Sequence, residues 1–145
     1  MNYHAVRIHK PELTNIGNCV IGPGTVIHPC HIYDGVIIGA NCQIEAGVML
    51  FDGVTLEDDV FIGPGAIITN DPKPKSVSRA NWKPTKTLIK KGAVIGAGAL
   101  IRAGVTVGEN ATVGMGSVVL SDILAGETWV GNPARPIKEF INDDD

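Results

Sequence analysis

The chain has 145 residues, enough for one domain, with 12 Lys and Arg against 15 Asp and Glu and a formal net charge of −3. This charge disfavours a general nucleic-acid-binding protein, and no apolar stretch is long enough to span a membrane. The first residues lack the apolar run of a signal peptide, so a cytoplasmic location is expected. Cys19, Cys30 and Cys42 are odd in number and show no metal-motif spacing. We interpret them as reduced core residues and expect no metal site.

An aliphatic residue recurs at intervals of six residues in two blocks of the chain, which we predict to be coils over residues 15–69 and 87–124. The segments begin at Ile21, Ile27, Ile38, Ile44, Leu50, Leu56, Ile62, Ile68, Ile89, Ile95, Ile101, Val107, Val113 and Val119. Gly often follows the first residue, and a small or β-branched residue usually stands four places after it. A period of six is neither helical nor a simple strand alternation, and it is typical of a parallel β-helix of hexapeptides.

Three hexapeptides form one triangular turn, and successive turns stack about 4.7–4.9 Å apart, the spacing of paired strands. The first residue of each segment then points inward, and glycines near the corners permit a positive φ. Fourteen hexapeptides predict about four to five turns. We therefore expect one all-β domain over residues 1–145.

Two regions interrupt the six-residue pattern. Residues 33–37 form a segment of five, and residues 70–86 fit no hexapeptide, contain three prolines and are basic. A long loop that leaves a rigid wall is often functional, and its cations, Arg79 among them, are expected to attract a phosphorylated ligand. After the coils, residues 125–145 form a tail in which residues 131–136 predict a turn. A short helix over residues 137–141 and a frayed acidic end are expected to follow.

The hexapeptide pattern followed by GNPAR at residues 131–135 resembles the left-handed β-helix acyltransferases. The succession of residues 53–61 (GVTLEDDVF), 69–71 (TND), 87–93 (TLIKKGA) and 95–97 (IGA) is similar to nucleotide-sugar N-acetyltransferases, which acetylate 3-amino sugars linked to UDP or dTDP in bacterial surface-glycan biosynthesis. The resemblance covers roughly residues 20–137. It implies a left-handed β-helix, acetyl-CoA as cosubstrate, and a homotrimer whose active sites lie between subunits.

Acetyl transfer from a thioester needs a nucleophile, a route for its proton, and stabilisation of the oxyanion. O-acetyltransferases of this fold use a His beside the loop, where this chain has Asn70 and Asp71. That difference favours an amine acceptor, which Asn70 would hold and Asp71 would position or deprotonate. The alternative is that both residues only open the loop, because Asn-Asp-Pro is a good turn sequence. His28 and His31 match a His-x-x-His element of many relatives and are candidates to face the substrate.

The resemblance places acetyl-CoA along the C-terminal coils, held mainly by backbone groups at small residues and by cations at its phosphates. The positions that match are Lys90, Lys91, Gly98, Ala99, Arg102, Gly116, Ser117 and Arg135. The chain departs from the family at residues 44–48, where two Asn residues of an acceptor-binding stretch are missing and Glu45 adds a carboxylate. Glu45, Asp52 and Glu57 are candidate acceptor ligands.

Three functions remain open on this basis. The first is an acetyl-CoA-dependent N-acetyltransferase acting on an amino sugar, with Asn70 and Asp71 in place of a loop His. The second is an O-acetyltransferase on a sugar or small alcohol, with His28 or His31 as the base. The third is a non-catalytic trimeric scaffold, which predicts no binding of acyl-CoA.

Overall fold

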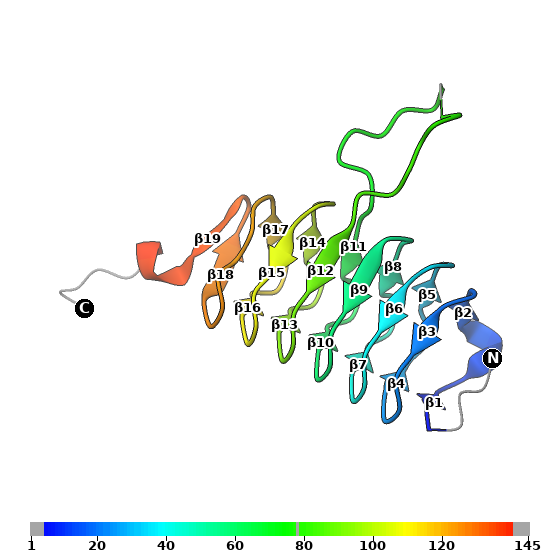
Figure 1. Cartoon of the computed structure of the whole chain (residues 1–145). Coiled ribbons are helices and arrows are strands. Elements are labelled where there is room, and N and C mark those ends of the chain that lie inside the picture. Colours follow the sequence, from blue (N-terminus) through cyan, green and yellow to red (C-terminus); the bar gives the residue numbers. More distant parts are fainter. Residues whose placement is uncertain (1–4, 78, 141–145) are drawn as a thin grey trace.

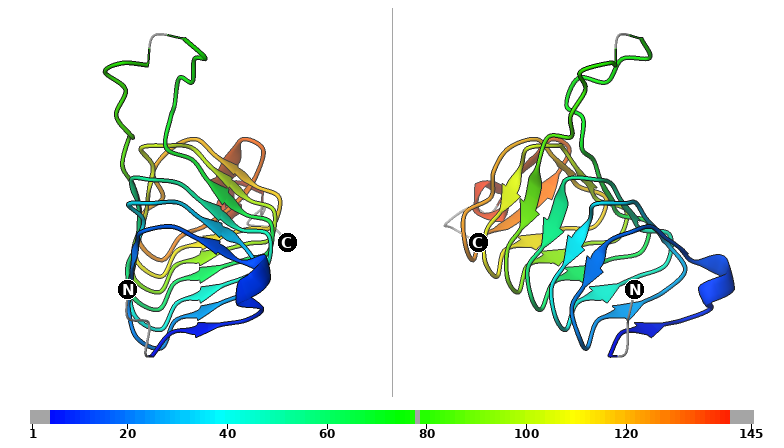
Figure 2. Two further views of the ribbon diagram at one scale, coloured as in Figure 1. Left: turned by 90° about the vertical axis from the view of Figure 1, so that its right-hand side faces the viewer. Right: turned by 45° about the vertical axis from the view of Figure 1, so that its right-hand side comes forward.

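The computed structural model describes residues 5–77 and 79–140, and within them short strands wind into a parallel β-helix of about seven turns (Figure 1). Seen close to its axis, the helix is a triangular prism whose walls are three sheets, here called A, B and C (Figure 2). The predicted all-β hexapeptide fold is confirmed, and the architecture is that of a left-handed β-helix. No helix in these described ranges is long and apolar enough to cross a membrane.

Each sheet collects every third strand of the chain up to β17, and β18 and β19 both join sheet A. Sheet A contains β1 (Arg7–Ile8), β4 (Val26–Ile27), β7 (Gln43–Ile44), β10 (Phe61–Ile62), β13 (Val94–Ile95), β16 (Thr112–Val113), β18 (Thr128–Gly131) and β19 (Ala134–Pro136). Sheet B contains β2 (Asn15–Ile16), β5 (His31–Ile32), β8 (Met49–Leu50), β11 (Ile67–Ile68), β14 (Leu100–Ile101) and β17 (Val118–Val119). Sheet C contains β3 (Val20–Ile21), β6 (Ile37–Ile38), β9 (Val54–Leu56), β12 (Thr87–Ile89) and β15 (Thr106–Val107).

The core is a set of stacked aliphatic side chains, one from the end of each strand. In sheet A, Ile44, Ile62 and Ile95 are paired in register and have no exposed surface. Each such side chain contributes about 1.5–3 kcal/mol on burial. A slip of one residue would turn the whole row outward, so the hexapeptide pattern sets the register as well as the fold.

The β-helix extends further at both ends than the sequence predicts. β1 lies before residue 15, separated from β2 by a 3₁₀ helix, η1 (Pro11–Leu13), and β18 lies after residue 124. Trp129 of β18 pairs in parallel with Val113 of β16, so part of the predicted tail is a coil of sheet A. The prediction of four to five turns was wrong because the terminal coils lack the six-residue repeat, with an insertion in one and a Trp in the other.

The segment after β18 turns back on the prism. β19 pairs with β18 in an antiparallel hairpin around Gly131, whose φ is 101°. A second 3₁₀ helix, η2 (Ile137–Phe140), follows, as the sequence predicts. Residue 141 and the acidic end of the tail lie outside the described residues.

The loop over residues 70–86 leaves the prism after β11 and returns to it at β12 (Figure 1). Its base is closed by the Thr85 amide, which donates to the Asn70 carbonyl at 2.8 Å. The Asn70 side chain also donates to the backbone carbonyl of Asp52 at 2.9 Å. The predicted boundaries of the loop match the structure.

The cysteines are buried in the N-terminal coils, as the sequence predicts. Burial raises the pKa of the Cys30 thiol to about 12, and the neighbouring Cys19 adds to the effect. Burial also raises the pKa of Cys42. A folded-state pKa above the unfolded one means that the folded protein retains a proton that the unfolded chain loses, so this contribution to stability is complete below about pH 8.5 and declines above it.

We expect the free energy of unfolding to fall between pH 9 and 11, with Cys30 contributing up to about 1.4 kcal/mol per pH unit. Urea unfolding of the wild type and of Cys30→Ala across this range measures the difference, since the variant lacks the titrating thiol and should show a shallower slope. Equal slopes in the two proteins would contradict the expectation.

Candidate active site

The most distinctive corner of the prism is the one at which strands of sheet A turn into strands of sheet B, here called the A–B corner. In each coil, one residue directly follows the strand of sheet A. Its amide donates to a carbonyl of the next coil at 2.7–3.0 Å, so these residues form a row along the prism. From the N-terminal end, these residues are His9, His28, Glu45, Gly63, Gly96 and Gly114. The corner therefore changes from ionisable side chains to glycines along the prism.

His28 and Glu45 form a contact between adjacent coils of this corner. His28 Nε2 lies 3.6 Å from Glu45 Oε2, and the two side chains are 32% and 22% exposed. His9 stacks on the His28 ring with centroids 4.6 Å apart, and Gln43 Nε2 donates to Glu45 Oε1 at 2.7 Å. A partly exposed imidazole oriented by a held carboxylate is the arrangement needed for a proton acceptor.

The glycine strip, defined as Gly63, Gly65, Gly96, Gly98, Gly114 and Gly116, continues the same corner toward the C-terminus. Gly98 and Gly116 have a φ of 68°, and a Cβ built on either would meet no atom within 4 Å. The backbone is thus open at Gly65, Gly98 and Gly116 on successive coils, with the side chains of Pro64, Ala97 and Met115 beside them. An extended ligand chain can approach the backbone only at such a surface.

Two backbone amides on this strip have no acceptor. The amides of Ala97 and Met115 make no hydrogen bond within the described parts of the chain. A Cβ on Gly63 would lie 2.6 Å from the Ala97 nitrogen, and one on Gly96 would lie 2.5 Å from the Met115 nitrogen. Because both residues are glycine, the two N–H groups stay uncovered and can donate to a ligand.

The corner between sheets C and A has turn amides of both kinds. There the equivalent turn amide of Ala40 donates to Asp58 Oδ1 at 2.8 Å, and that of Lys91 donates to Glu57 Oε1 at 2.9 Å. Carboxylates satisfy these two turn amides, whereas the amides of Asp58, Glu109 and Ala125 at the same corner make no hydrogen bond among the described residues. Open turn amides therefore occur at both corners, and those of the A–B corner differ in lying beside the His28–Glu45 pair.

The structure places the side chains of two predicted cofactor residues inside the prism. Ala99 and Ser117 are buried inside the prism, so their side chains cannot touch a ligand and only their backbone remains available. Ser117 Oγ instead accepts a hydrogen bond from the Gly131 amide at 3.1 Å and holds the C-terminal hairpin. Both lie four places into a hexapeptide, where a small residue faces the interior. Gly98 and Gly116, in contrast, lie on the open strip.

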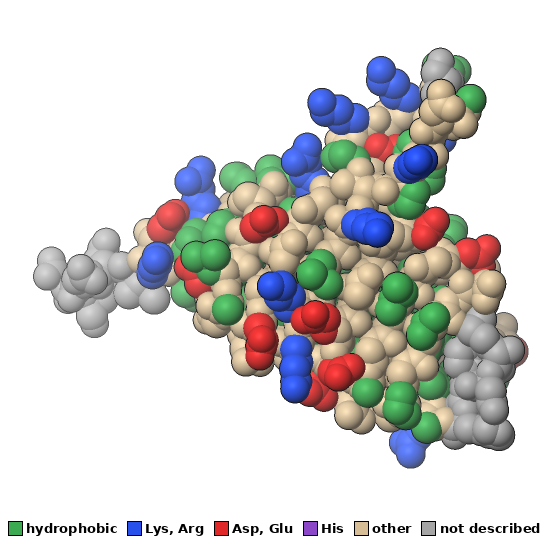
Figure 3. All heavy atoms as spheres, in the orientation of Figure 1, with side chains coloured by type: hydrophobic (Ala, Val, Ile, Leu, Met, Phe, Trp, Pro, Cys, Tyr) green, Lys and Arg blue, Asp and Glu red, His purple; other side chains and the backbone are tan. Residues whose placement is uncertain are grey.

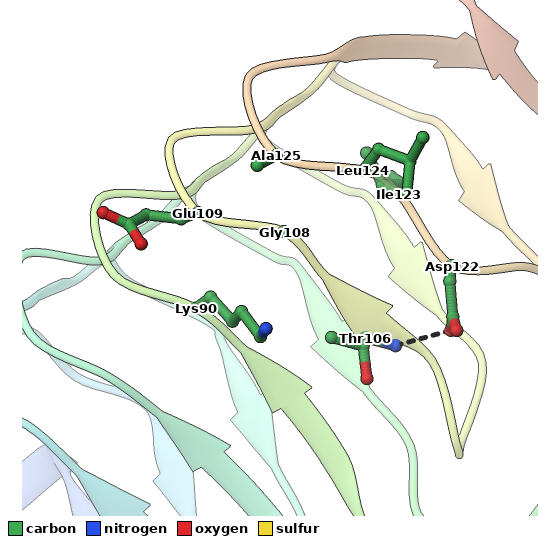
Figure 4. Close-up of a pocket in the computed structure, with 8 residues that line it drawn as sticks. All are labelled: Lys90, Thr106, Gly108, Glu109, Asp122, Ile123, Leu124 and Ala125. Carbon is green, nitrogen blue, oxygen red and sulfur yellow. Dashed lines mark hydrogen bonds between the residues drawn. The ribbon is translucent and has the colours of Figure 1, made fainter.

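The predicted phosphate-binding cations are spread over the other corners of the chain. Lys90 and Lys91 follow β12 at the corner between sheets C and A, Arg102 follows β14 at the corner between sheets B and C, and Arg135 lies exposed on β19. Figure 4 shows Lys90 at a cavity of about 270 Å³ on sheet C, where Thr106 donates to Asp122 Oδ1 and Glu109 lies nearby. Two carboxylates beside one lysine make this cavity a poor phosphate site. Within one subunit, these cations therefore do not converge on the glycine strip.

The loop residues proposed for catalysis lie away from the A–B corner, at the corner between sheets B and C. Asn70 uses its side chain and its carbonyl to close the base of the loop. Asp71 Oδ2 accepts from Trp82 Nε1 at 2.8 Å, and its Oδ1 accepts from the Lys73 amide at 2.9 Å. Arg79 lies 3.8 Å from the same carboxylate. The alternative that this pair shapes the loop fits these contacts.

His31 belongs to a third environment. Its ring stacks on Tyr33, which stacks on Phe51, with centroids 4.3 and 4.7 Å apart. It lies on the outer face of sheet B, whereas His28 lies at the corner before it. Asp52 is exposed beside Phe51, and Glu57 caps the Lys91 amide. The structure therefore brings together only His28 and Glu45 among the predicted catalytic and acceptor residues outside the loop.

Sequence reasoning missed His9, Gln43, and the amides of Ala97 and Met115. A signal for the amides exists, because Gly-x-Gly recurs at residues 63–65, 96–98 and 114–116. In residues 5–77 and 79–140, no group of three or more His, Cys, Asp or Glu is placed to hold a metal ion.

Comparison with known proteins identifies the family of the chain. The family described as bacterial transferase hexapeptide (six repeats) matches residues 35–70 and 86–121, and the hexapeptide repeat of succinyl-transferase matches residues 16–52. The chain therefore belongs to the hexapeptide-repeat transferases.

Individual relatives are acetyltransferases. The chain is 36% identical over 110 residues to a serine acetyltransferase of Buchnera aphidicola subsp. Acyrthosiphon pisum (strain APS), covering 74% of this chain and 38% of that protein. The acetyltransferase domain of PglB from Neisseria gonorrhoeae FA1090, in complex with acetyl coenzyme A, has 27% identity and a TM-score of 0.75, over 91% of this chain and 57% of that one. A hexapeptide-repeat acetyltransferase from Vibrio cholerae O1 biovar eltor, also with acetyl coenzyme A, has 28% identity and a TM-score of 0.64, over 87% and 71% of the two chains. The chain thus spans little more than half of the PglB domain chain and well under half of the serine acetyltransferase.

Proposed function

We propose that the protein is an acetyl-CoA-dependent acetyltransferase whose reaction takes place at the A–B corner. One observation carries the proposal: the His28–Glu45 pair and the glycine strip with its two unpaired amides lie on the same corner in adjoining coils. The first supplies a proton acceptor and the second a track for an extended, amide-containing ligand. The two relatives that contain acetyl coenzyme A support the choice of ligand.

Different residues of the corner bind the cosubstrate and transfer the proton. The amides of Ala97 and Met115 would donate to carbonyls of the pantetheine arm, which fits because nothing covers them. Bound acetyl-CoA supplies an activated acetyl thioester. His28 takes the proton from the attacking amine or hydroxyl, and Glu45 stabilises the resulting imidazolium. The contact of 3.6 Å is expected to shorten when substrate binds, as such contacts often do.

For the acceptor we propose an amino sugar, with a nucleotide-linked sugar as the expected form. Support comes from the resemblance of residues 53–61, 69–71 and 87–97 to nucleotide-sugar N-acetyltransferases. A hydroxyl acceptor is the second candidate, because the His28–Glu45 pair is able to deprotonate an alcohol and the serine acetyltransferase is a relative at 36% identity. A neutral amine needs less help from a base than a hydroxyl does.

We further propose a homotrimer as the active form. Met49, Ile67, Leu100 and Val118 stand in register on the outer face of sheet B, with Leu100 42% exposed. Packing of this apolar row against a neighbouring copy removes it from water. The loop of one subunit would then lie near the A–B corner of the next and supply cations that this corner lacks. Sedimentation equilibrium tests this directly, since a monomeric mass at working concentration would contradict it.

The decisive experiment measures release of free thiol from acetyl-CoA with a panel of acceptors. The panel holds UDP- and dTDP-linked 3-amino and 4-amino sugars, the matching sugars with hydroxyl groups only, and serine. Turnover confined to the amino sugars is the expected result. Turnover with hydroxyl acceptors alone would replace N-acetylation by O-acetylation. No turnover together with no acetyl-CoA binding in calorimetry would leave the scaffold and reject the enzyme.

A further inference from the structure

The loop over residues 70–86 encloses a cavity of its own. The cavity has a volume of about 260 Å³ and is lined mainly by Asp71, Lys73, Lys75, Arg79, Asn81 and Trp82. Its three cations and one carboxylate give a local charge of +2, whereas the whole chain carries −3. Figure 3 shows Lys and Arg side chains gathered on the projecting loop.

Asp71 holds the residues that line this cavity in place. Its carboxylate accepts from the Lys73 amide and from Trp82 Nε1, at 2.9 and 2.8 Å, which ties the two sides of the loop together. The Arg79 guanidinium lies 3.8 Å from the same carboxylate and 4.9 Å from the centre of the Trp82 ring. It also donates to the Lys75 carbonyl at 2.7 Å. The charge of Arg79 is therefore largely satisfied inside the loop.

The two lysines are placed differently. Neither the Lys73 nor the Lys75 ammonium group has a carboxylate partner among the described residues. Both line the same cavity as Trp82, a residue that is 38% exposed. Unpaired ammonium groups next to an aromatic face suit a ligand that carries a phosphate and a ring.

We propose that this loop cavity is a preformed binding site for a phosphate or diphosphate group, and that Asp71 is the positioning residue that keeps it formed. Asp71 then acts through Trp82 and Arg79 and does not take a proton from the substrate. Two molecules of the proposed reaction contain the required chemistry, the nucleotide-linked acceptor and the phosphates of acetyl-CoA. This last step rests on the proposed function, whereas anion binding by the cavity does not.

The first test measures binding of inorganic pyrophosphate by calorimetry at low ionic strength. We expect the double variant Lys73→Ala, Lys75→Ala to bind pyrophosphate about tenfold more weakly than the wild type. Each substitution removes one exposed contact between an ammonium group and a phosphate. The matched control is Lys83→Ala, Lys86→Ala, which removes the same charge from the same loop outside the cavity and should change binding by less than about twofold. Equal losses in both variants, or no binding by the wild type, would overturn the proposal.

The source of the phosphate is settled by kinetics with the same pair of variants. A higher KM for the nucleotide-linked acceptor, with an unchanged KM for acetyl-CoA, assigns the cavity to the acceptor, and the reverse assigns it to the cosubstrate. If no acceptor is turned over while pyrophosphate still binds through Lys73 and Lys75, the cavity stands and the proposed function fails.

The role of Asp71 is tested by comparing Asp71→Asn with Trp82→Phe. Phenylalanine keeps a ring for Arg79 but removes the indole N–H that Asp71 holds. For a positioning residue, kcat should be retained in both variants, and Trp82→Phe should raise KM and weaken pyrophosphate binding. Asp71→Asn loosens the same contact but also removes a negative charge from the cavity, so its effect on pyrophosphate binding should be the smaller of the two. A loss of kcat in Asp71→Asn that Trp82→Phe does not share would make Asp71 a catalytic base and overturn this part of the proposal.

Discussion

Replacing His28 with Asn is expected to lower kcat by about 10²–10⁴-fold with little change in the KM for acetyl-CoA. His28 is the ionisable side chain that stands on the A–B corner with a carboxylate partner, since Glu45 lies 3.6 Å away and Gln43 holds that carboxylate in place. Without the imidazole, the attacking group keeps its proton as it meets the thioester. Steady-state thiol release with the best acceptor of the panel measures the effect. Glu45→Gln should lower kcat less, because it leaves the imidazole in place.

His31→Asn is the matched control for this prediction. The same substitution three residues along the chain affects a ring that stacks on Tyr33 on the outer face of sheet B. It should change kcat by less than about threefold, as substitutions away from the reacting groups usually do. A large loss of kcat at His31 with normal activity at His28 would move the proton acceptor to sheet B and contradict the assignment of the A–B corner.

Placing side chains on the glycine strip should block binding of acetyl-CoA. We expect the double variant Gly98→Asn, Gly116→Asn to raise the KM and the dissociation constant of acetyl-CoA by about 100-fold, roughly tenfold for each lost backbone contact. Asn is the suitable replacement because it tolerates a positive φ. The chain already uses Asn41 and Asn110 at φ of 56° and 57° in the turns between sheets C and A.

Gly126→Asn provides the control for a change that is only structural. Gly126 has a φ of 74°, and a Cβ there would also meet nothing within 4 Å, but it lies at the corner between sheets C and A. Both the double variant and Gly126→Asn should retain the melting temperature of the wild type within a few degrees. If Gly126→Asn weakens acetyl-CoA binding as much as the double variant does, the ligand follows another corner of the prism.

We assign Asp71 to the structure of the loop and His28 to proton transfer, and both assignments depend on which corner of the prism each residue occupies. Asp71 is attractive in the sequence because it occupies the place of a loop histidine, yet its carboxylate already receives hydrogen bonds from Trp82 and Lys73. His28 looks like one residue of a turn until Glu45, 17 residues later, is placed on the next coil. Neither fact is visible in a local motif.

The sequence predicts only part of the glycine strip for the same reason. Gly98 and Gly116 were expected to contact the cosubstrate, and they lie on the open surface. Ala99 and Ser117, which follow them directly, face the interior because the next position in the hexapeptide points inward. The cations at Lys90, Lys91 and Arg102 match the family but lie on other corners.

The amino-acid sequence alone determines the β-helix, because a six-residue period can bury its aliphatic positions only if the segments stack in register. It also determines where the loop begins and ends, because residues 70–86 lack the aliphatic side chains at six-residue intervals that would point into the prism. Only the tertiary structure decides which corner each turn occupies. Gly96 lies one coil from Gly63 although 33 residues separate them, whereas Gly114 lies one coil from Gly96 after 18. The inserted loop and the five-residue segment change how many residues separate two neighbouring coils, but not the distance between the coils along the prism. The site consists of residues from neighbouring coils, so its make-up follows the prism and not the spacing in the sequence.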